Sequence, residues 1–236
     1  AEIENCGKDG LDAKTAKGHL LAALEACNTA DEVISQYAFI EQEITRARAA
    51  LTPVTGHGEA AYVKDETDAV EKLLADAEAA AKGGQNYAKV STGIEAAIAQ
   101  TKAALEMAEQ HKAYKDLRAK PEVEPRLAVL EGHEHRYAIK PSIDTMRKKL
   151  ADAAAQDAGK QPADAIKLLE EARAIGTSAY VMAQMRANTP PDPADIEKIL
   201  ARPGGTAELD AMIDNLEPEA QRAVVSRVLG EVVKDG

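Results

Sequence analysis

The chain has 236 residues and a formal net charge of −11, from 29 basic and 40 acidic side chains. This balance argues against sequence-independent nucleic-acid binding, which needs a basic surface, and against docking on an anionic membrane. Aromatic residues make up 3% of the chain, so Ala, Leu, Ile and Val must supply the buried area. Such a composition suits close-packed helices, and we predict an all-α fold.

No apolar run approaches the roughly 18 residues of a membrane-spanning helix, and no signal peptide is recognisable. The chain begins at Ala1 rather than Met and stops at Gly236, directly after an apolar periodic run, which favours a piece of a longer protein. Cys6 and Cys27 are too few for a disulfide framework. A bridge between them is the alternative for an exported protein, but Cys27 lies on an apolar helical stripe, which favours a reduced, packed thiol.

One stretch of the chain recurs: 51–79 matches 127–155 without a gap after a shift of 76 positions. Internal self-similarity of this kind is typical of repeat architectures. The identical positions, given by their first copy, are Leu51, Gly56, His57, Lys64, Asp68, Lys72, Leu74, Ala75, Asp76, Ala77 and Ala79.

The N-terminal part reads as two helices. Periodicity predicts the first over 11–28, with Leu20, Leu24 and Cys27 on one face. Thr29 and Glu32 form a capping box, which predicts the start of a second helix. Its apolar residues step alternately by four and three, as in a heptad seam, until Pro53 ends the helix. The seam residues are Val33, Tyr37, Ile40, Ile44, Ala47 and Leu51.

Two long helix pairs follow. After a connector at 52–58, we predict a third helix near 59–82 and a fourth near 87–119. The fourth would be about 50 Å long, which predicts an elongated molecule. The expected inward residues of the third helix are Ala69, Leu73, Ala77 and Ala80, and those of the fourth are Tyr87, Val90, Ile94, Ala97, Thr101, Leu105 and Ala108.

The second pair repeats this arrangement after Pro121 and Pro125. A short helix or turn precedes it, and Ser142 is predicted to cap a helix that ends at Ala158. Its partner is expected over 163–187. The expected inward residues of the pair are Ile143, Met146, Leu150 and Ala153, followed by Ile166, Leu169, Ala172, Tyr180 and Ala183.

Three short helices close the chain after a proline-rich hinge at 188–193. Asp192 is predicted to cap the first, with Pro193 at its first position. Thr206 is predicted to cap the second, and Pro218 to begin the third, which carries Val224 and Leu229. We expect these aliphatic-rich helices to form a small subdomain or a docking surface.

The expected architecture is therefore an elongated array of long antiparallel helix hairpins, spectrin-like or bundle-like, repeating about every 76 residues. We expect four parts. They are an N-terminal helix pair that is a diverged or partial unit (1–53), repeat unit 1 (54–129), repeat unit 2 (130–189) and the small helical C-terminal subdomain (190–236).

The adjacent His133, Glu134 and His135 are the candidates for metal ligation, since these side chains bind zinc and other transition metals. Their spacing argues against a site, because zincin helices place two histidines four residues apart on one face. The first copy keeps only His57. A recurring Gly-His pair instead favours a structural role, with glycine ending a helix and the imidazole bonding a terminal carbonyl.

Asp76 and Asp152 also recur, but no matching base or nucleophile accompanies them. We expect both carboxylates to face water or to pair with Lys72 and Lys148, four residues earlier, because they lie mid-helix beside inward leucines. The six tyrosines are spread about one per helix, which favours packing over a binding groove. No phosphate-binding glycine loop or serine-nucleophile motif is present. The run Arg147-Lys148-Lys149 is flanked by acids and is expected to be a solvated helix face.

The segment from Ile199-Leu200-Ala201-Arg202-Pro203-Gly204-Gly205-Thr206 through Leu229 resembles a short helical element of very large bacterial proteins that carry toxin or effector domains. The Ala-rich helix pairs before it are similar in style to the spacer regions of such proteins. The resemblance implies a helical scaffold within an exported effector, whose activity lies outside this chain. It carries no catalytic motif.

These observations predict a non-catalytic scaffold, spacer or protein-interaction module, with no cofactor and no catalytic residue. The expected partner is a protein or an adjoining domain of a larger chain, not nucleic acid or a membrane. The sequence leaves two compartments for this protein, the cytoplasm or secretion as part of a bacterial effector. A ligand-binding or sensor bundle is the first alternative, and its one buried polar candidate is Thr101. A metal-dependent helical enzyme is the second.

Overall fold

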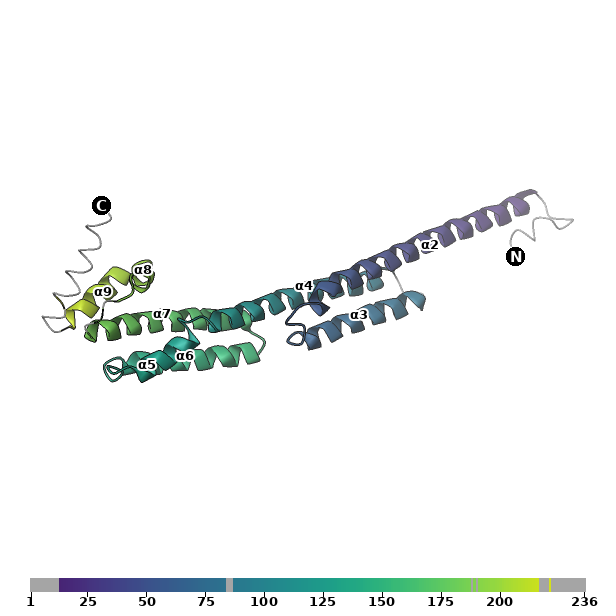
Figure 1. Cartoon of the computed structure of the whole chain (residues 1–236). Helices are drawn as coiled ribbons and strands as arrows, with labels where there is room; N and C mark the ends of the chain where they lie inside the picture. The colour runs from purple at the N-terminus through teal and green to yellow at the C-terminus, as the bar shows by residue number, and fades with distance from the viewer. Residues whose placement is uncertain (1–12, 84–86, 188, 190, 217–220, 222–236) are drawn as a thin grey trace. The chain divides into compact units, whose positions relative to one another are not determined.

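The computed structural model describes residues 13–83, 87–187, 189, 191–216 and 221 (Figure 1). Within these residues the chain forms eight α-helices and no strand, which confirms the all-α prediction. None of the described helices is long and apolar enough to cross a membrane. The helices are α2 (Ala13–Thr55), α3 (Lys64–Lys82), α4 (Tyr87–Arg118), α5 (Glu124–Gly132), α6 (Lys140–Ala158), α7 (Pro162–Arg186), α8 (Pro193–Leu200) and α9 (Gly205–Asp214).

The chain divides into two compact units, Ala1–Ala108 and Glu109–Gly236. The division falls within α4, so this helix gives most of its length to the first unit and its end to the second.

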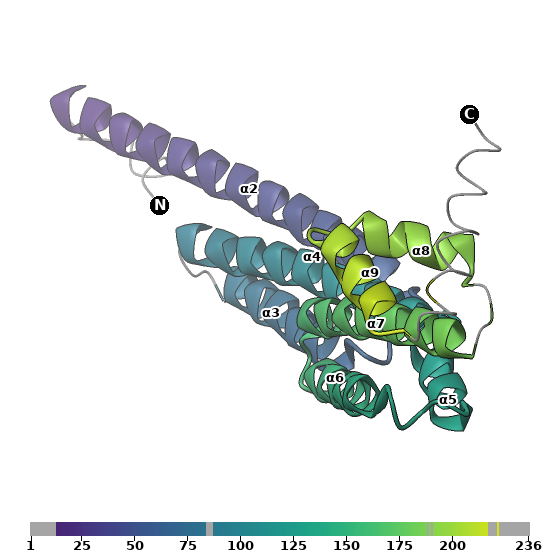
Figure 2. The same cartoon turned by 90° about the vertical axis from the view of Figure 1, so that its left-hand side faces the viewer.

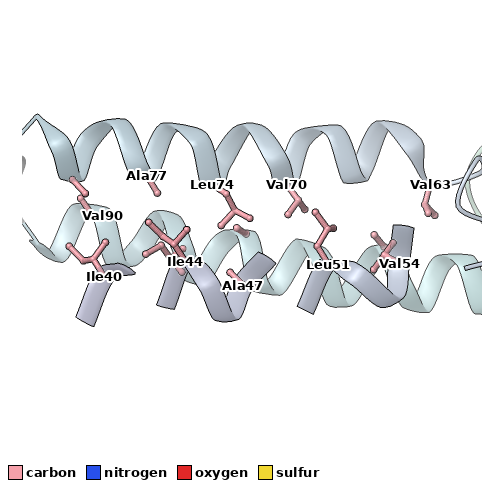
Figure 3. Close-up of a cluster of buried hydrophobic side chains, with 14 of the residues drawn as sticks. Ile40, Ile44, Ala47, Leu51, Val54, Val63, Val70, Leu74, Ala77 and Val90 are labelled. Carbon is pink, nitrogen blue, oxygen red and sulfur yellow. The ribbon is translucent and has the colours of Figure 1, made fainter. Parts of the chain in front are cut away.

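The first unit packs α2, α3 and the start of α4 around one apolar core (Figure 3). The C-terminal half of α2 supplies Ile40, Ile44 and Leu51, which are buried as the heptad seam predicted. The first predicted seam residue, Val33, is instead 42% exposed. Residues spaced three and four apart fall on one face of a helix, so the seam is continuous. The other buried members include Val54, Val63, Val70, Leu74, Ala77, Val90, Ile94 and Ala97.

On α3 the predicted Ala77 is buried, but the rest of the inward face differs from the prediction by one position. Val70 and Leu74 are buried, whereas Leu73 is only partly buried. The two faces are neighbours on the helix, and the buried one carries two large aliphatic side chains where the predicted one carries mostly Ala. Burying the face with Val70 and Leu74 removes more apolar surface from water, and this determines which face of α3 turns toward the core.

The second unit has a core between α6 and α7, joined by α5 and the end of α4. All four residues predicted to face inward from α6 are buried, among them Met146 and Leu150. On α7, Leu169, Ala172 and Ala183 are buried as predicted, while Ile166 and Tyr180 are partly buried.

Helices α8 and α9 add a smaller cluster to the second unit. Ile199 of α8 and Met212 of α9 pack with Val181 and Met185 of α7. The predicted hinge before α8 is therefore followed by helices that pack back on α7. The predicted third short helix from Pro218 lies outside the described residues.

Helices α3 and α6 repeat each other's geometry at the 76-residue shift. Both contain 19 residues, and the residues before them, Val63 and Ile139, have φ of −107° in each case and ψ of 23° and 12°. At the next turn Lys64 bonds Asp68, and Lys140 bonds Asp144 at 2.7 Å. The recurrence in sequence is thus also a recurrence of local backbone and side-chain geometry.

The predicted break at Thr29 is wrong, because α2 runs without interruption from Ala13 to Thr55. The Thr29 hydroxyl donates to the carbonyl of Glu25 at 2.9 Å, a bond made inside a helix. A cap needs non-helical backbone at its own residue, and no glycine or proline interrupts the helix there. Pro53 also lies inside α2, which ends two residues later.

Two predicted caps are wrong as well. Ser142 lies inside α6, which begins at Lys140 with Pro141 in its first turn. Thr206 lies inside α9, which begins at Gly205 after the left-handed Gly204. Cys27 is exposed rather than packed, and Cys6 lies outside the described residues.

Candidate functional site

The two recurring histidines hold the connectors before α3 and α6. The Nδ1 atom of His57 accepts the backbone N–H of Glu59, and that of His133 accepts the backbone N–H of His135, both at 3.1 Å. An Nδ1 that accepts carries no proton, so each neutral ring has its proton on Nε2. Each imidazole thus closes a tight turn in its connector.

The expected role of the Gly-His pair is corrected in one respect. We predicted that the imidazole would bond a carbonyl at the helix end, but the ring accepts from an N–H beyond it. Gly132 is the last residue of α5, and the backbone N–H of His133 bonds the Leu130 carbonyl at 3.2 Å. The backbone closes the helix, which leaves the ring for the turn that follows.

The metal candidates His133, Glu134 and His135 lie together in the second connector. The imidazole rings of His133 and His135 are 5.8 Å apart, and His135 Nε2 lies 3.6 Å from a Glu134 oxygen. The Nδ1 of His133 is occupied by the turn bond. In the part of the chain that the structure describes, no three His, Cys, Asp or Glu side chains converge as metal ligands.

Asp76 and Asp152 are both exposed, as predicted from their position beside inward leucines. They lie on the solvent side of α3 and α6. This exposure leaves each carboxylate in water, outside the enclosed surroundings that are typical of catalytic acids and bases.

Spacing in the sequence did not reveal a pair between His111 and Asp157. Nδ1 of His111 lies 2.8 Å from Oδ1 of Asp157, and both side chains are more than four-fifths buried. The His111 ring stacks on Tyr114 with centroids 6.2 Å apart. An Asp–His pair supports catalysis when it also orients a nucleophile. The contact seen here joins the end of α4 to the end of α6.

A second buried charge cluster joins α5 to α8. Asp195 of α8 is 3% exposed at its side chain and accepts from Arg126 at 3.1 Å and from Lys198 at 3.0 Å. The guanidinium of Arg126 also lies 4.0 Å from the centre of the Tyr180 ring, a cation–π contact. Lys198 reaches Glu122 at 3.3 Å. The cluster fixes α8 on the second unit.

The charges in this cluster shift one another's pKa values. Burial alone would raise the pKa of Asp195, but hydrogen bonds from Lys198 and Arg126 outweigh it and hold that pKa below its usual range. A hydrogen bond from its own backbone N–H, with Lys198 and Arg173 nearby, lowers the pKa of Glu122 against the effect of burial. The carboxylates of Asp195 and Glu122 are therefore both ionised at neutral pH.

Open grooves lie at equivalent places in the two units, beside α3 and beside α6. Thr55, Asp68 and Glu71 line the first, and their counterparts Glu131, Asp144 and Arg147 line the second. Glu71 and Arg147 carry opposite charges, so the two grooves differ in charge at this equivalent position. The identical positions of the two copies thus support the packing of the helices, whereas the side chains that line the grooves differ in charge.

The buried hydroxyl that favoured a sensor, Thr101, is satisfied within its own helix. It donates to the Ala97 carbonyl at 2.8 Å and is 4% exposed. Thr67 and Thr177 make the same kind of bond, to the carbonyls of Lys64 and Arg173. None of these three hydroxyls needs a ligand to satisfy its donor.

Comparison with known proteins gives no relative. No family model matches the chain, and neither a curated protein nor a solved structure is significantly similar to it.

Proposed function

We propose that this chain is a non-catalytic helical scaffold, a spacer or protein-interaction module built from tandem helix-hairpin units. One observation carries the proposal: the local geometry of α3 and its connector recurs at α6, 76 residues later. Repeated units of this kind bury a continuous core between neighbours and extend a chain by addition.

The pattern of what recurs supports the same conclusion. Buried positions match in both copies, such as Val54 with Leu130 and Val63 with Ile139. Turn-forming histidines match as well. The groove residues Glu71 and Arg147 do not match in charge. A duplicated binding or catalytic site would require matching chemistry, whereas a duplicated support requires only matching packing.

The two longest helices suit a spacer. At 1.5 Å per residue, α2 is about 65 Å long and α4 about 48 Å. Because α4 contributes to both units, a helix rather than a loop connects them. We propose that the hairpin units follow one another along the chain as an extended array.

Small-angle scattering with mass determination tests the array. A compact globule of 236 residues has a radius of gyration of about 18 Å. Measured at a dilution where the particle has the mass of one chain, the scaffold should give a clearly larger value. A radius near 18 Å at that mass would refute the extended array.

Ligand and metal measurements test the non-catalytic part of the proposal. A thermal-shift screen of small molecules and an elemental analysis of the purified protein should give no saturable hit and no stoichiometric metal. A saturable small-molecule hit would favour the sensor alternative. A stoichiometric metal lost on His133→Ala or His135→Ala substitution would favour the metal enzyme.

A further inference from the structure

The N-terminal half of α2 carries an apolar face that none of the other described residues of the first unit covers. Residues 13–36 lie beyond the ends of α3 and α4 (Figures 1 and 2). Leu20, Leu24 and Ile34 are 56%, 58% and 65% exposed. Most of the exposed large hydrophobic side chains of the described chain lie on this helix, and such a concentration marks an interaction surface.

The exposed face has a coiled-coil pattern. Leu20, Cys27 and Ile34 are seven residues apart, as are Ala23, Ala30 and Tyr37, and the two series occupy the a and d positions of one heptad. The d series continues into the seam residues Ile44 and Leu51, which are buried in the first unit. The exposed face is therefore continuous with an established helix–helix interface.

We propose that this face binds the same segment of a second copy of the chain, as an antiparallel coiled coil whose twofold axis passes near Glu25. The chain would then be a homodimer through α2. The pairing is isologous, so every contact occurs twice.

Side-chain size supports the antiparallel register. With the axis near Glu25, Leu20 faces Ala30 of the second copy, and Cys27 faces Ala23 of the second copy. Each layer then pairs a larger side chain with a small one, which fills space evenly. A parallel pairing in register would place Ala23 against Ala23 and leave voids in alternate layers.

Charge supports the same register. Lys17 and Asp31 both occupy the e position, and e positions of antiparallel helices flank the interface together. In this register Lys17 of each copy lies beside Asp31 of the other. Leu24, also at e, meets Leu24 of the second copy at the axis. The opposite ends of one segment thus supply complementary charges.

The length of α2 before the hairpin of α3 and α4 agrees with the position of the axis. The hairpin of α3 and α4 ends near Phe39, whose ring centroid is 6.2 Å from that of Tyr87. The part of α2 that precedes this contact therefore runs from Ala13 to about Tyr37, and its middle is Glu25. Heptad pairing and available length place the axis independently at the same residue.

The inference adds a partner to the proposed scaffold role, but the two can fail separately. If the chain is a monomer, the dimer proposal is refuted and the scattering test of the scaffold still applies. If the single chain is compact, the extended scaffold is refuted and the dimer proposal still stands.

Analytical ultracentrifugation of the full chain tests the dimer. The single chain has a mass of 25.1 kDa, and we expect twice that value. Leu20→Glu should weaken dimerisation by at least roughly a hundredfold, since it removes two buried leucines from the dimer. Leu21→Glu is the matched control, because Leu21 is 52% exposed but lies outside the a, d and e positions. It should leave the dimer intact.

Circular dichroism shows whether the Leu20 and Leu21 variants are still folded, so that a lost dimer is not confused with unfolding. Leu20 is exposed in the single chain, so Leu20→Glu should preserve the two packed units. A wild-type chain that stays monomeric at high concentration, or equal effects of the Leu20 and Leu21 variants, would overturn the proposal.

A charge swap and a cross-link test the register. Lys17→Glu and Asp31→Lys should each weaken the dimer by about threefold to tenfold, and the double variant should recover it. With Cys6→Ser as background, Ala23→Cys should give a disulfide-linked dimer through Cys27 on mild oxidation. Efficient cross-linking of the Cys6→Ser chain through Cys27 alone would instead show a parallel pair and overturn the antiparallel register.

Discussion

The imidazoles of His57 and His133 hold the same turn at two places in the chain. Each ring accepts, through Nδ1, the backbone N–H two residues later, at 3.1 Å in both cases. Both side chains are half-buried, so water only partly replaces the lost bond when the ring is removed. The turn bond therefore gives each histidine a structural role, and neither metal binding nor catalysis is needed to explain why it is there.

We expect His57→Ala and His133→Ala to lower the free energy of unfolding by about 1 kcal/mol each, because each leaves a backbone N–H unsatisfied. Asn in their place should recover part of the loss, since its side-chain oxygen accepts from the same N–H. Chemical denaturation measures both effects. His135→Ala is the control and should change little, because that ring lies 5.8 Å from the His133 ring and 3.6 Å from the exposed Glu134 and holds no backbone N–H in these contacts. Equal losses for His133→Ala and His135→Ala would contradict the turn role.

Leu74 and Leu150 occupy equivalent buried positions, 1% and 8% exposed. We expect Leu74→Ala and Leu150→Ala each to cost about 2–5 kcal/mol, from lost burial and the cavity left behind. The somewhat more exposed Leu150 should be toward the lower end. Equilibrium denaturation gives both values.

Lys72→Ala and Lys148→Ala, two residues before these leucines and on the exposed side of each helix, are the controls and should stay within about 0.5 kcal/mol of the wild type. The leucine substitutions lie in different units, so their effects should add in the double variant. Strong non-additivity would show that the two cores are coupled.

Local signals predicted much of this fold. Asp192 accepts the N–H of Ala194 at 2.9 Å, as expected for a capping residue before Pro193. The cap at Thr29 failed although its capping box looks similar, because no proline or glycine stops the helix that arrives from Cys27. A helix cap can thus be predicted from sequence when the residues before it end the preceding helix and the residues after it begin a new one.

The charge clusters could not be predicted in the same way. His111 and Asp157 are 46 residues apart, and Arg126 and Asp195 are 69 apart. Helix periodicity gives the face of each residue but not which other helix that face meets. The repeat did not help, because none of these four residues belongs to the identical positions of the two copies.

Asp195 should make the docking of α8 sensitive to acid. Hydrogen bonds from Lys198 and Arg126 overcome burial and lower the pKa of Asp195, so the folded state favours its charged form. The resulting stability is present above the ordinary carboxyl pKa of about 4 and is lost as the pH falls through the lower folded value. Unfolding monitored from pH 7 to pH 2 should show this loss, and Asp195→Asn should reduce it.

We expect Asp195→Ala to cost about 3 kcal/mol at pH 7, because it leaves Arg126 buried without its partner. Asp164→Ala is the control. Its pair with Lys167 is exposed at both side chains, so its loss should cost less than about 1 kcal/mol. Similar costs for the two substitutions would show that the Asp195 cluster is not a stabilising contact.

The turn between α8 and α9 requires two adjacent glycines for different reasons. Gly204 has φ of 77°, and nothing lies within 4 Å of the place a Cβ would occupy. Gly204→Ala should therefore cost only the backbone strain, about 1–2 kcal/mol. At Gly205 a Cβ would lie 1.9 Å from the backbone oxygen of Ile199, so α8 and α9 would have to separate. Gly205→Ala should cost more than Gly204→Ala and loosen Met212 from Met185, which hydrogen exchange in α9 measures. An equal or smaller effect at Gly205 would show that the two helices can move apart without losing their packing on α7.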